Sequence, residues 1–555
     1  MSLVFMGDDD FRVGRSIQSS SSLKVWQYII LAIVLLSGFF VIYMVHFSYD
    51  DYFISPHDNR FIVKGYNEYY PYPYHADEWA HLASAEYIIS EGKIANVNPY
   101  LQTSRHFNLE SGFDGFLAEF FLVTSLDPMV FYQFLPAFFM MLTMASLFFF
   151  MYTITKKYFI AILAPLFLLL IRNNINIMGL WFFLPITFSL FLIFMFFATY
   201  FSEGRIRYLS IMIFFAAMFS YPLSGIIIAS VTILYECIRL VSDKEYRKSL
   251  SRFLTFKYMK YVIIGLAMIV IAAMIILRGY FIEIFQGNFI ELPFIFKYGW
   301  TVNFEHTYNP LEMYGWIATI LAMIGIVFVF VKKLNKLLIS WLIVLIIPII
   351  MYSLLNFTIL IPYQRAFFFF LIGLAPLSAI GVYYIYVMIY LAMYHIFFRR
   401  DKKEDKTIPK IISTGIIVML LLVTFFIGFQ DYYKVDDPRF RLVQYAQDSD
   451  VSALEWVKIH YAKNDLMMVD MFSAFISYPI SNVQVTSVPP SNLAVGNSQD
   501  VQAFFYGTYP YDCQAKYSIL NHDKPKLVYS YMQFSCTYLT EVYNKDGVFI
   551  YEVKY

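Results

Sequence analysis

The chain has few charged residues. Asp, Glu, Lys and Arg make up only 15% of its 555 residues, whereas a soluble domain averages about 25%. The 41 basic and 40 acidic residues leave a net charge of +1, so the chain as a whole has no charge that would attract nucleic acid. Cysteine is also scarce: Cys237, Cys513 and Cys536 include no pair with the spacing of a metal-binding motif. These deficits exclude an ordinary soluble enzyme and a cysteine-type metal site.

Apolar residues are correspondingly abundant. They make up 59% of the chain, aromatic residues alone 20%, and the mean hydropathy is +0.58. This composition excludes a disordered or fibrous protein and predicts an α-helical polytopic membrane protein. A spanning helix needs about 20 apolar residues, and eleven runs are candidates, two of them short: 25–47, 130–153, 158–171, 178–201, 208–220, 222–240, 260–280, 312–331, 337–355, 366–398 and 411–430. The first run is too long for a cleaved signal peptide, and no small-residue cleavage site follows it.

Lysine and arginine indicate the orientation of these spans. With the N-terminus inside, the inner segments hold 23 of these residues and the outer loops up to residue 430 hold 8. Such an excess is typical of the cytosolic side. The sequence therefore predicts a cytosolic tail at 1–24 and a transmembrane domain at 25–430 with a large outside loop at 48–129. An extracytoplasmic domain follows at 431–555.

The last region is expected to fold as a small α/β domain. Ala453, Trp456 and Val457 form a helical stripe, and the segments 466–469, 483–488 and 526–531 are predicted to be strands. A hairpin turn at 544–547 joins two further strands, 541–543 and 548–553. Because this domain would lie on the oxidising side, we expect a disulfide between Cys513 and Cys536, although a free pair is also compatible with the sequence.

The segment that follows the first span combines acids with an imidazole. Residues 74–93 have helical periodicity, and Asp77 and Glu78 fall near the expected N-terminus, where the helix dipole favours ionised carboxylates. At about 100° per residue, Asp77, His81 and Ser84 share one face, and Glu78 points a quarter turn away. Asp77 could act as a general base or a metal ligand. The alternative is that Asp77 only caps the helix.

A family resemblance rests on these residues. One span, then Asp77-Glu78 at the start of an outside helix, then Asn98-Pro99-Tyr100 resembles the GT-C superfamily. Its members are integral-membrane glycosyltransferases that use polyprenyl-phosphate-linked sugars. They include the protein O-mannosyltransferases, the aminoarabinose transferases and the catalytic subunits of oligosaccharyltransferase. Further segments resemble the layout of these enzymes: 113–131, 221–224, 363–381 and the region from 454 to the last hairpin.

The resemblance implies a reaction and roles for the two acids. A sugar would pass from a polyprenyl-phosphate donor to a protein, glycolipid or polysaccharide acceptor outside the membrane. Asp77 would accept the proton of the acceptor while the sugar carbon inverts. Glu78 matches the second position of the pattern and would orient Asp77 or the acceptor. The layout suits the cell membrane of an archaeon or bacterium, and an endoplasmic reticulum location is also compatible.

The phosphate of the donor requires positive charge near the membrane surface. Arg365, at the start of a span, is the best placed to donate two hydrogen bonds to phosphate oxygens. Arg172 and Arg278 are weaker candidates, and His81 is a further one because it shares the face of Asp77. The alternative for each arginine is a side chain that snorkels to the interface.

The sequence departs from the metal-dependent members of the superfamily. Oligosaccharyltransferase-type members carry a second acidic motif between the third and fourth spans, but the segment 172–176 here contains no acid. Asp77, Glu110 and Asp114, with His106, remain weak candidates, as does the pair Glu305-His306. Their hard ligands would suit Mg²⁺ or Mn²⁺. Solvated side chains are the alternative, and the sequence establishes no cofactor.

Two other function classes compete. A transporter or lipid-linked-glycan flippase would need ionisable groups near the membrane midplane, and the centres of these spans are almost free of charge. A non-catalytic assembly or receptor subunit would need no carboxylate at the membrane surface. The sequence thus favours a glycosyltransferase whose partners are the lipid-linked donor, its acceptor and membrane lipid, with no nucleic acid.

Overall fold

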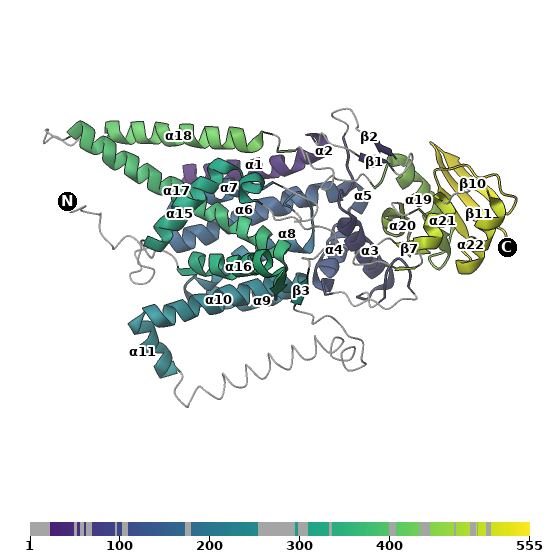
Figure 1. The fold of residues 1–555 in the computed structure, drawn as a ribbon, viewed down its shortest axis with the longest axis horizontal. Coiled ribbons are helices and arrows are strands. Elements are labelled where there is room, and N and C mark those ends of the chain that lie inside the picture. The colour runs from purple at the N-terminus through teal and green to yellow at the C-terminus, as the bar shows by residue number, and fades with distance from the viewer. Residues whose placement is uncertain are drawn as a thin grey trace. The chain divides into compact units, whose positions relative to one another are not determined.

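The computed structural model shows a mainly helical protein with strands near its C-terminus (Figure 1). The chain forms two compact units. The first comprises Ser19–Gly225 with Leu422–Tyr555, and the second contains Ile226–Leu421. The structure describes residues 23–48, 53–55, 60–62, 69–94, 97–102, 109–172, 179–253, 295–297, 309–331, 336–398, 407–430, 432–433, 445–470, 473–488, 495–496, 498–506 and 512–555.

Long apolar helices confirm a polytopic membrane protein. Among the described residues, six stretches are long and apolar enough to cross a membrane: Val25–Phe47, Pro128–Thr155, Pro222–Ser242, Lys336–Leu355, Tyr363–Ile396 and Thr407–Phe429. Tyr158–Leu168, Pro185–Tyr200 and Trp316–Val331 are shorter apolar helices. Ten of the eleven predicted runs coincide with helices. The run at 260–280 lies outside the described residues.

Helix α6 (Leu135–Thr155) is central to the membrane part of the first unit. It packs against α1 (Val25–Tyr43), α7 (Tyr158–Leu168) and α8 (Pro185–Tyr200), and α9 (Leu209–Ser220) packs on α8. Because α6 is apolar on all sides, it can be buried among several helices. The shorter elements here are α2 (Val45–Ser48), β1 (Phe53–Ser55), β2 (Arg60–Ile62), α5 (Pro128–Phe131), η2 (Tyr132–Phe134) and η3 (Gly204–Tyr208).

Two helices of the first loop support the site. Helix α3 (Ala76–Glu91) packs against α4 (Ser111–Thr124), and α4 in turn packs against α9. Gly112 permits the second contact, because a Cβ at this position would lie 2.6 Å from the backbone oxygen of Phe219. The loop helix α4 is therefore fixed against the membrane helices without an intervening side chain.

A five-stranded sheet forms the core of the C-terminal region, with the strand order β10-β11-β9-β5-β6. Strand β5 runs parallel to β6 and β9, while β11 lies between β9 and β10 and is antiparallel to both. The α/β character predicted from the sequence is confirmed. The elements are α19 (Asp448–His460), β5 (Leu466–Met468), α20 (Ser473–Ser481), β6 (Gln484–Val485), β7 (Ser487–Val488), β8 (Val495–Gly496), α21 (Ser498–Tyr506), α22 (Cys513–Asp523), β9 (Leu527–Ser530), β10 (Leu539–Lys545) and β11 (Val548–Val553).

One predicted strand is divided in the structure. The run 483–488 was expected to be a single strand, but it forms β6, which pairs with β5, and β7, which pairs with β8. The chain leaves the main sheet at Thr486, whose backbone N–H donates to the carbonyl of Met467. Cys513 and Cys536 are joined by a disulfide that ties the start of α22 to the segment before β10.

The second unit is built around α17 (Tyr363–Phe398). It packs closely against α15 (Trp316–Val331) and against α16 (Lys336–Leu355). Gly325 and Gly381 allow the backbones of α15 and α17 to touch, because a Cβ at Gly381 would lie 2.0 Å from the carbonyl oxygen of Leu321. The other elements are α10 (Pro222–Ser242), which begins in the first unit, α11 (Lys244–Phe253), β3 (Ile295–Lys297), α14 (Pro310–Tyr314), β4 (Phe357–Ile359) and α18 (Thr407–Phe429), which ends in the first unit.

Candidate active site

His75 and Glu78 determine where α3 begins. His75 is the N-cap, with an extended backbone, and its Nδ1 accepts a hydrogen bond from the Asp77 N–H at 3.1 Å. Glu78 completes a capping box, since its Oε2 accepts from the His75 N–H at 3.0 Å. Gly92 ends the helix with a left-handed conformation at φ +66°. The alternative that Asp77 only caps the helix is therefore wrong: the cap is His75, and the Asp77 carboxylate is left for another role.

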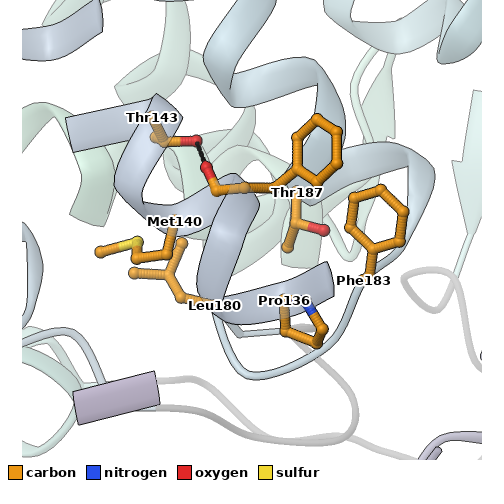
Figure 2. Close-up of a pocket in the computed structure, with 7 residues that line it drawn as sticks. Pro136, Met140, Thr143, Leu180, Phe183 and Thr187 are labelled. Atoms are coloured by element: carbon orange, nitrogen blue, oxygen red, sulfur yellow. Dashed lines mark hydrogen bonds between the residues drawn. The ribbon is translucent and has the colours of Figure 1, made fainter. Parts of the chain in front are cut away.

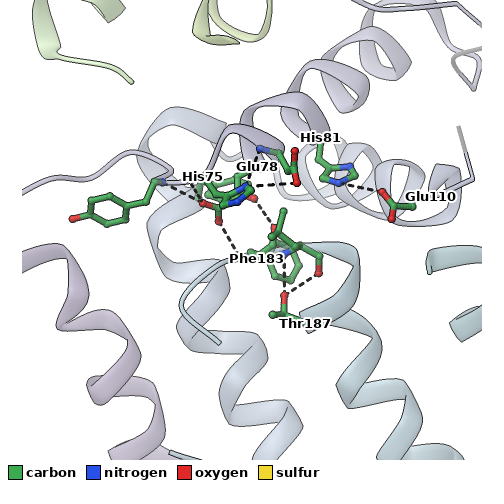
Figure 3. Close-up of polar contacts among 10 residues, drawn as sticks. His75, Glu78, His81, Glu110, Phe183 and Thr187 are labelled. Carbon is green, nitrogen blue, oxygen red and sulfur yellow. Dashed lines mark hydrogen bonds and ion pairs between the residues drawn. The ribbon is translucent and has the colours of Figure 1, made fainter. Parts of the chain in front are cut away.

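Glu78 is a buried anchor between α3 and the segment before α8. Its Oε2 also accepts from the Tyr74 N–H at 3.1 Å, and its Oε1 accepts from the Phe183 N–H at 2.8 Å (Figure 3). The residue is only 2% exposed, and burial raises the pKa of its carboxyl to about 8 even though the three N–H groups oppose this shift. Of the two roles expected of Glu78, orientation of Asp77 fits this burial, whereas contact with an acceptor does not.

His81 connects α3 to α4. Its Nδ1 lies 2.7 Å from Oδ1 of Asp114, and its Nε2 lies 3.5 Å from Oε2 of Glu110 (Figure 3). Burial would lower the pKa of the imidazole, but the two carboxylates outweigh burial and raise this pKa to about 9. The ring is therefore cationic at neutral pH, donates from Nδ1 to Asp114 and forms an ion pair with Glu110. The phosphate-binding role predicted for His81 stays a prediction, and two acids already face its charge.

The acids predicted as metal ligands do not form a compact group of three ligands among the described residues. The His81 ring lies between Glu110 and Asp114, and its two nitrogens each face one of the acids. Within the described part of the chain, three ligand groups come within 4.8 Å of one another at Asp500, His522 and Asp523, not at the first-loop acids. His106, Glu305 and His306 lie outside the described residues.

Asp77 is the accessible acid of the first turn of α3, where Glu78 is buried. Its side chain is 19% exposed, and its Oδ2 lies 3.7 Å from the Nδ1 of His75. Its charge adds to the effect of burial in raising the pKa of Tyr100 and of Tyr445, which places both tyrosines within electrostatic reach. Asp77 thus presents an accessible carboxylate in the first turn of a helix, and such a carboxylate can accept a proton.

The C-terminal region braces the same helix and its flanking loop. The Tyr72 hydroxyl donates to Oδ1 of Asp448 at 2.7 Å, and the Tyr100 hydroxyl donates to the carbonyl of Phe475 at 2.8 Å. Lys458 lies 3.7 Å from Glu86 on α3, and α20 packs directly on this helix. Helix α3 is consequently held between α4 on one side and the C-terminal helices on another.

A small apolar pocket includes Phe183, whose backbone binds Glu78 (Figure 2). It is lined mainly by apolar side chains of α6 and of the segment that leads into α8. The ring of Phe183 lines this pocket while the backbone N–H of Phe183 is bound by Glu78. Asp77 is not among its lining residues, which are Pro136, Phe139, Met140, Thr143, Leu180, Phe183 and Thr187.

The candidate phosphate ligands have separate environments. Arg365 lies in the first turn of α17 in the second unit and is 6% exposed. Arg172 belongs to the first unit and donates from Nη2 to the carbonyl of Gln430 at 3.1 Å. Arg278 lies outside the described residues. Their binding of phosphate stays a prediction.

The roles of some residues of the site were not predicted from the sequence. Asp114 and Glu110 were considered as metal ligands, but their pairing with His81 links positions about 30 residues apart and has no sequence signature. Phe183 contributes through its backbone N–H, which any residue except proline could supply. Only the capping box left a signal, because Glu78 follows His75 by three residues. That signal is weak, since the usual N-cap residues are Ser, Thr, Asp and Asn.

The comparisons with known proteins concern the fold. No protein-family model and no curated protein matches the sequence. The oligosaccharyltransferase of Archaeoglobus fulgidus, solved with a tethered acceptor peptide containing the NVT sequon, aligns with a TM-score of 0.54 at 12% identity, over 92% of this chain and 70% of that one. AglB of the same archaeon, in complex with an inhibitory peptide and a dolichol-phosphate, gives a TM-score of 0.55 at 12% identity, over 91% and 69%.

A bacterial structure shows the same similarity. ArnT of Cupriavidus metallidurans, bound to undecaprenyl phosphate, aligns with a TM-score of 0.50 at 10% identity, over 95% of this chain and 97% of that one. AglB and ArnT are GT-C glycosyltransferases. The chain therefore has the GT-C fold, and the fold predicted from the sequence resemblance is confirmed.

Proposed function

We propose that the protein is a membrane glycosyltransferase that moves a sugar from a polyprenyl-phosphate-linked donor to an acceptor on the extracytoplasmic side. The observation that carries this proposal is Asp77, an accessible carboxylate at the N-terminus of a rigidly held first-loop helix in a GT-C fold. The fold accommodates polyprenyl phosphates in other proteins: the similar AglB and ArnT structures contain a dolichol-phosphate and undecaprenyl phosphate.

The proposed reaction is a single displacement at the sugar carbon. A hydroxyl or amide of the acceptor attacks this carbon, and the bond from the carbon to the phosphate oxygen breaks. The proton of the acceptor passes to the Asp77 carboxylate, and the polyprenyl phosphate leaves with the bonding electrons. Asp77 lies in the first turn of α3, where the helix dipole acts on its carboxylate. Glu78 fixes the backbone that presents Asp77.

Arg365 and Arg172 are the proposed partners of the donor phosphate. The leaving phosphate gains negative charge, and a guanidinium stabilises such charge with two parallel hydrogen bonds. A divalent ion would supply the same neutralisation, and one structure of the Archaeoglobus enzyme is a complex with Zn and sulfate. The proposed reaction is written without a metal ion, and Mg²⁺ or Mn²⁺ at the first-loop acids stays a proposal that the chelator tests.

The proposed orientation puts the N-terminus in the cytosol and the C-terminal region outside the cell membrane of an archaeon or bacterium. The distribution of lysine and arginine supports this orientation. The acceptor would then be a protein side chain, a glycolipid or a polysaccharide on the outer face, so the C-terminal region, which contacts α3, lies on the side where the acceptor arrives.

A transfer assay tests the proposal. Purified protein would be incubated with a panel of radiolabelled polyprenyl-phosphate sugars and membrane extract, with and without chelator. We expect Asp77→Asn to lower the transfer rate by about 10²–10⁴-fold, because the substitution keeps the shape and removes the base. Glu119→Gln, an exposed acid on α4, is the matched control and should keep wild-type activity.

The outcomes separate the alternatives. Equal transfer by wild type and Asp77→Asn would remove Asp77 from the catalytic role. Loss of transfer with chelator would show a metal requirement. If no donor of a broad panel is bound or transferred by the wild type, the transporter, flippase or assembly-subunit interpretation is favoured instead.

A further inference from the structure

Helix α11 is a basic helix attached to the end of a membrane span. The span Pro222–Ser242 ends one residue before α11 begins at Lys244. Residues 239–260 contain seven basic and two acidic residues. The proposed transfer reaction uses none of these basic residues, and they lie in a different compact unit from Asp77.

The turn between α10 and α11 is held by specific contacts. Oδ1 of Asp243 accepts from the backbone N–H groups of Glu245 and Tyr246, at 3.0 and 3.1 Å, and so caps α11. The guanidinium of Arg239 lies over the Tyr246 ring, 4.0 Å from its centroid, and Arg239 also pairs with Glu236 at 3.9 Å. Tyr246 is therefore packed on the end of α10, and α11 bends away from this helix (Figure 1).

The packing of Tyr246 orients the charges of α11. At about 100° per residue, Lys244, Arg247 and Lys248 occupy one arc of the helix, opposite Tyr246. All three basic residues are exposed, whereas Tyr246 is half-buried. The sequence continues this division, with Arg252 in register with the basic residues and with Leu250 and Phe253 in register with Tyr246. The helix is thus amphipathic, with a basic face and an apolar face.

We propose that α11 lies along the membrane surface and binds anionic phospholipid headgroups through Lys244, Arg247 and Lys248. An amphipathic basic helix fits the boundary between headgroups and acyl chains, and each cation near an anionic membrane surface adds to its affinity. The helix begins one residue after a span, so its first turn is within reach of the headgroup layer. This proximity favours lipid over a soluble acidic protein as the ligand. The inference does not depend on the proposed transfer reaction.

Lipid binding by the full-length protein tests this inference. Delipidated protein in detergent would be titrated with phosphatidylglycerol or with phosphatidylcholine, and bound lipid would be counted by native mass spectrometry. We expect the wild type to prefer phosphatidylglycerol, with a preference that falls as salt increases. The triple variant K244Q/R247Q/K248Q should lose about tenfold or more of this preference.

Two matched variants control for total charge and for folding. K156Q/K157Q/R207Q removes three cations from other connectors and should keep the preference. K244R/R247K/K248R keeps the charge and should also keep the preference for phosphatidylglycerol. Thermal unfolding midpoints would show that each variant is folded.

The inference is overturned if the triple variant retains the preference while folded, or if K156Q/K157Q/R207Q loses as much of it. An acidic polypeptide probe, polyglutamate, would be titrated in parallel. Tighter binding of polyglutamate than of phosphatidylglycerol, abolished in the triple variant, would assign the helix to an acidic protein partner instead.

Discussion

Asp77 and Glu78 are adjacent in the chain, yet the helix gives them different chemistry. A quarter turn separates their side chains, which is enough to leave Asp77 accessible and to direct Glu78 toward three backbone N–H groups. The sequence predicted this quarter turn from helical periodicity. It did not predict which side is buried, because that depends on Phe183, which is about 100 residues away.

Substitution of Glu78 tests its role as an anchor. In Glu78→Gln, one oxygen becomes an NH₂ group that cannot accept from the backbone N–H groups facing it. We expect a loss of about 1–3 kcal/mol of stability, the cost of an unsatisfied buried donor, seen as a lower thermal unfolding midpoint in detergent. Glu119→Gln makes the same change at an exposed site and should leave the midpoint unchanged. An unaltered midpoint in Glu78→Gln would show that the anchor is dispensable.

The His81 pair predicts a dependence of stability on pH. Because folding raises the pKa of His81 from its ordinary value of 6.5 to about 9, the pair stabilises the folded state fully below pH 6.5. This contribution is lost as pH rises through about 9. We expect the thermal unfolding midpoint of the wild type to fall as pH rises from 6.5 to about 9. The midpoint of Asp114→Asn should be lower at pH 6.5 and should fall less over the same range.

An exposed histidine provides the comparison for this pH series. His522 is 66% exposed, so His522→Gln should keep the wild-type slope. Equal slopes in wild type and Asp114→Asn would contradict the pairing. No periodicity in the sequence indicates this pair, because His81 and Asp114 are brought together by the packing of two separate helices.

Among the elements, α15 and α17 make the most demanding contact. Gly325 and Gly381 face the backbone of the opposite helix, and their Cβ atoms would lie 1.9 Å from Leu377 O and 2.0 Å from Leu321 O. We expect Gly381→Ala to separate the helices and to cost about 1–3 kcal/mol, measured as a lower thermal midpoint. Gly415→Ala, on α18, places its Cβ in open space and should be neutral or slightly stabilising. A tolerated Gly381→Ala would mean that the helices do not touch here.

Helices were predicted from the sequence more completely than the short strands. A long apolar run signals a span whatever its neighbours are, so ten of the eleven runs coincide with helices. The run 483–488 is rich in β-branched residues along its whole length, and its division at Thr486 reflects two different partners, β5 and β8. Pairing partners distant in sequence leave no local pattern, which is why the single strand predicted there was wrong.

At the scale of the whole molecule, the three cysteines allow the proposed membrane topology to be tested. Cys237 is exposed on α10, near the end predicted to be cytosolic, and the disulfide of Cys513 and Cys536 lies in the region predicted to be outside. On sealed right-side-out vesicles, a membrane-impermeant maleimide should label Cys513 and Cys536 only after an impermeant reductant is added. Cys237 should react only after permeabilisation, as mass spectrometry of the peptides would show. The reverse pattern would invert the proposed topology.

The contacts of the first loop with the C-terminal region affect how the protein is made. Tyr72 and Tyr100 bind Asp448 and Phe475, partners that the ribosome reaches about 375 residues later. During synthesis, α3 therefore lacks its contacts with the C-terminal region until that region has been translated and exported. The proposed transfer activity would therefore appear only late in synthesis. Nascent or truncated chains would be inactive and would not glycosylate acceptors.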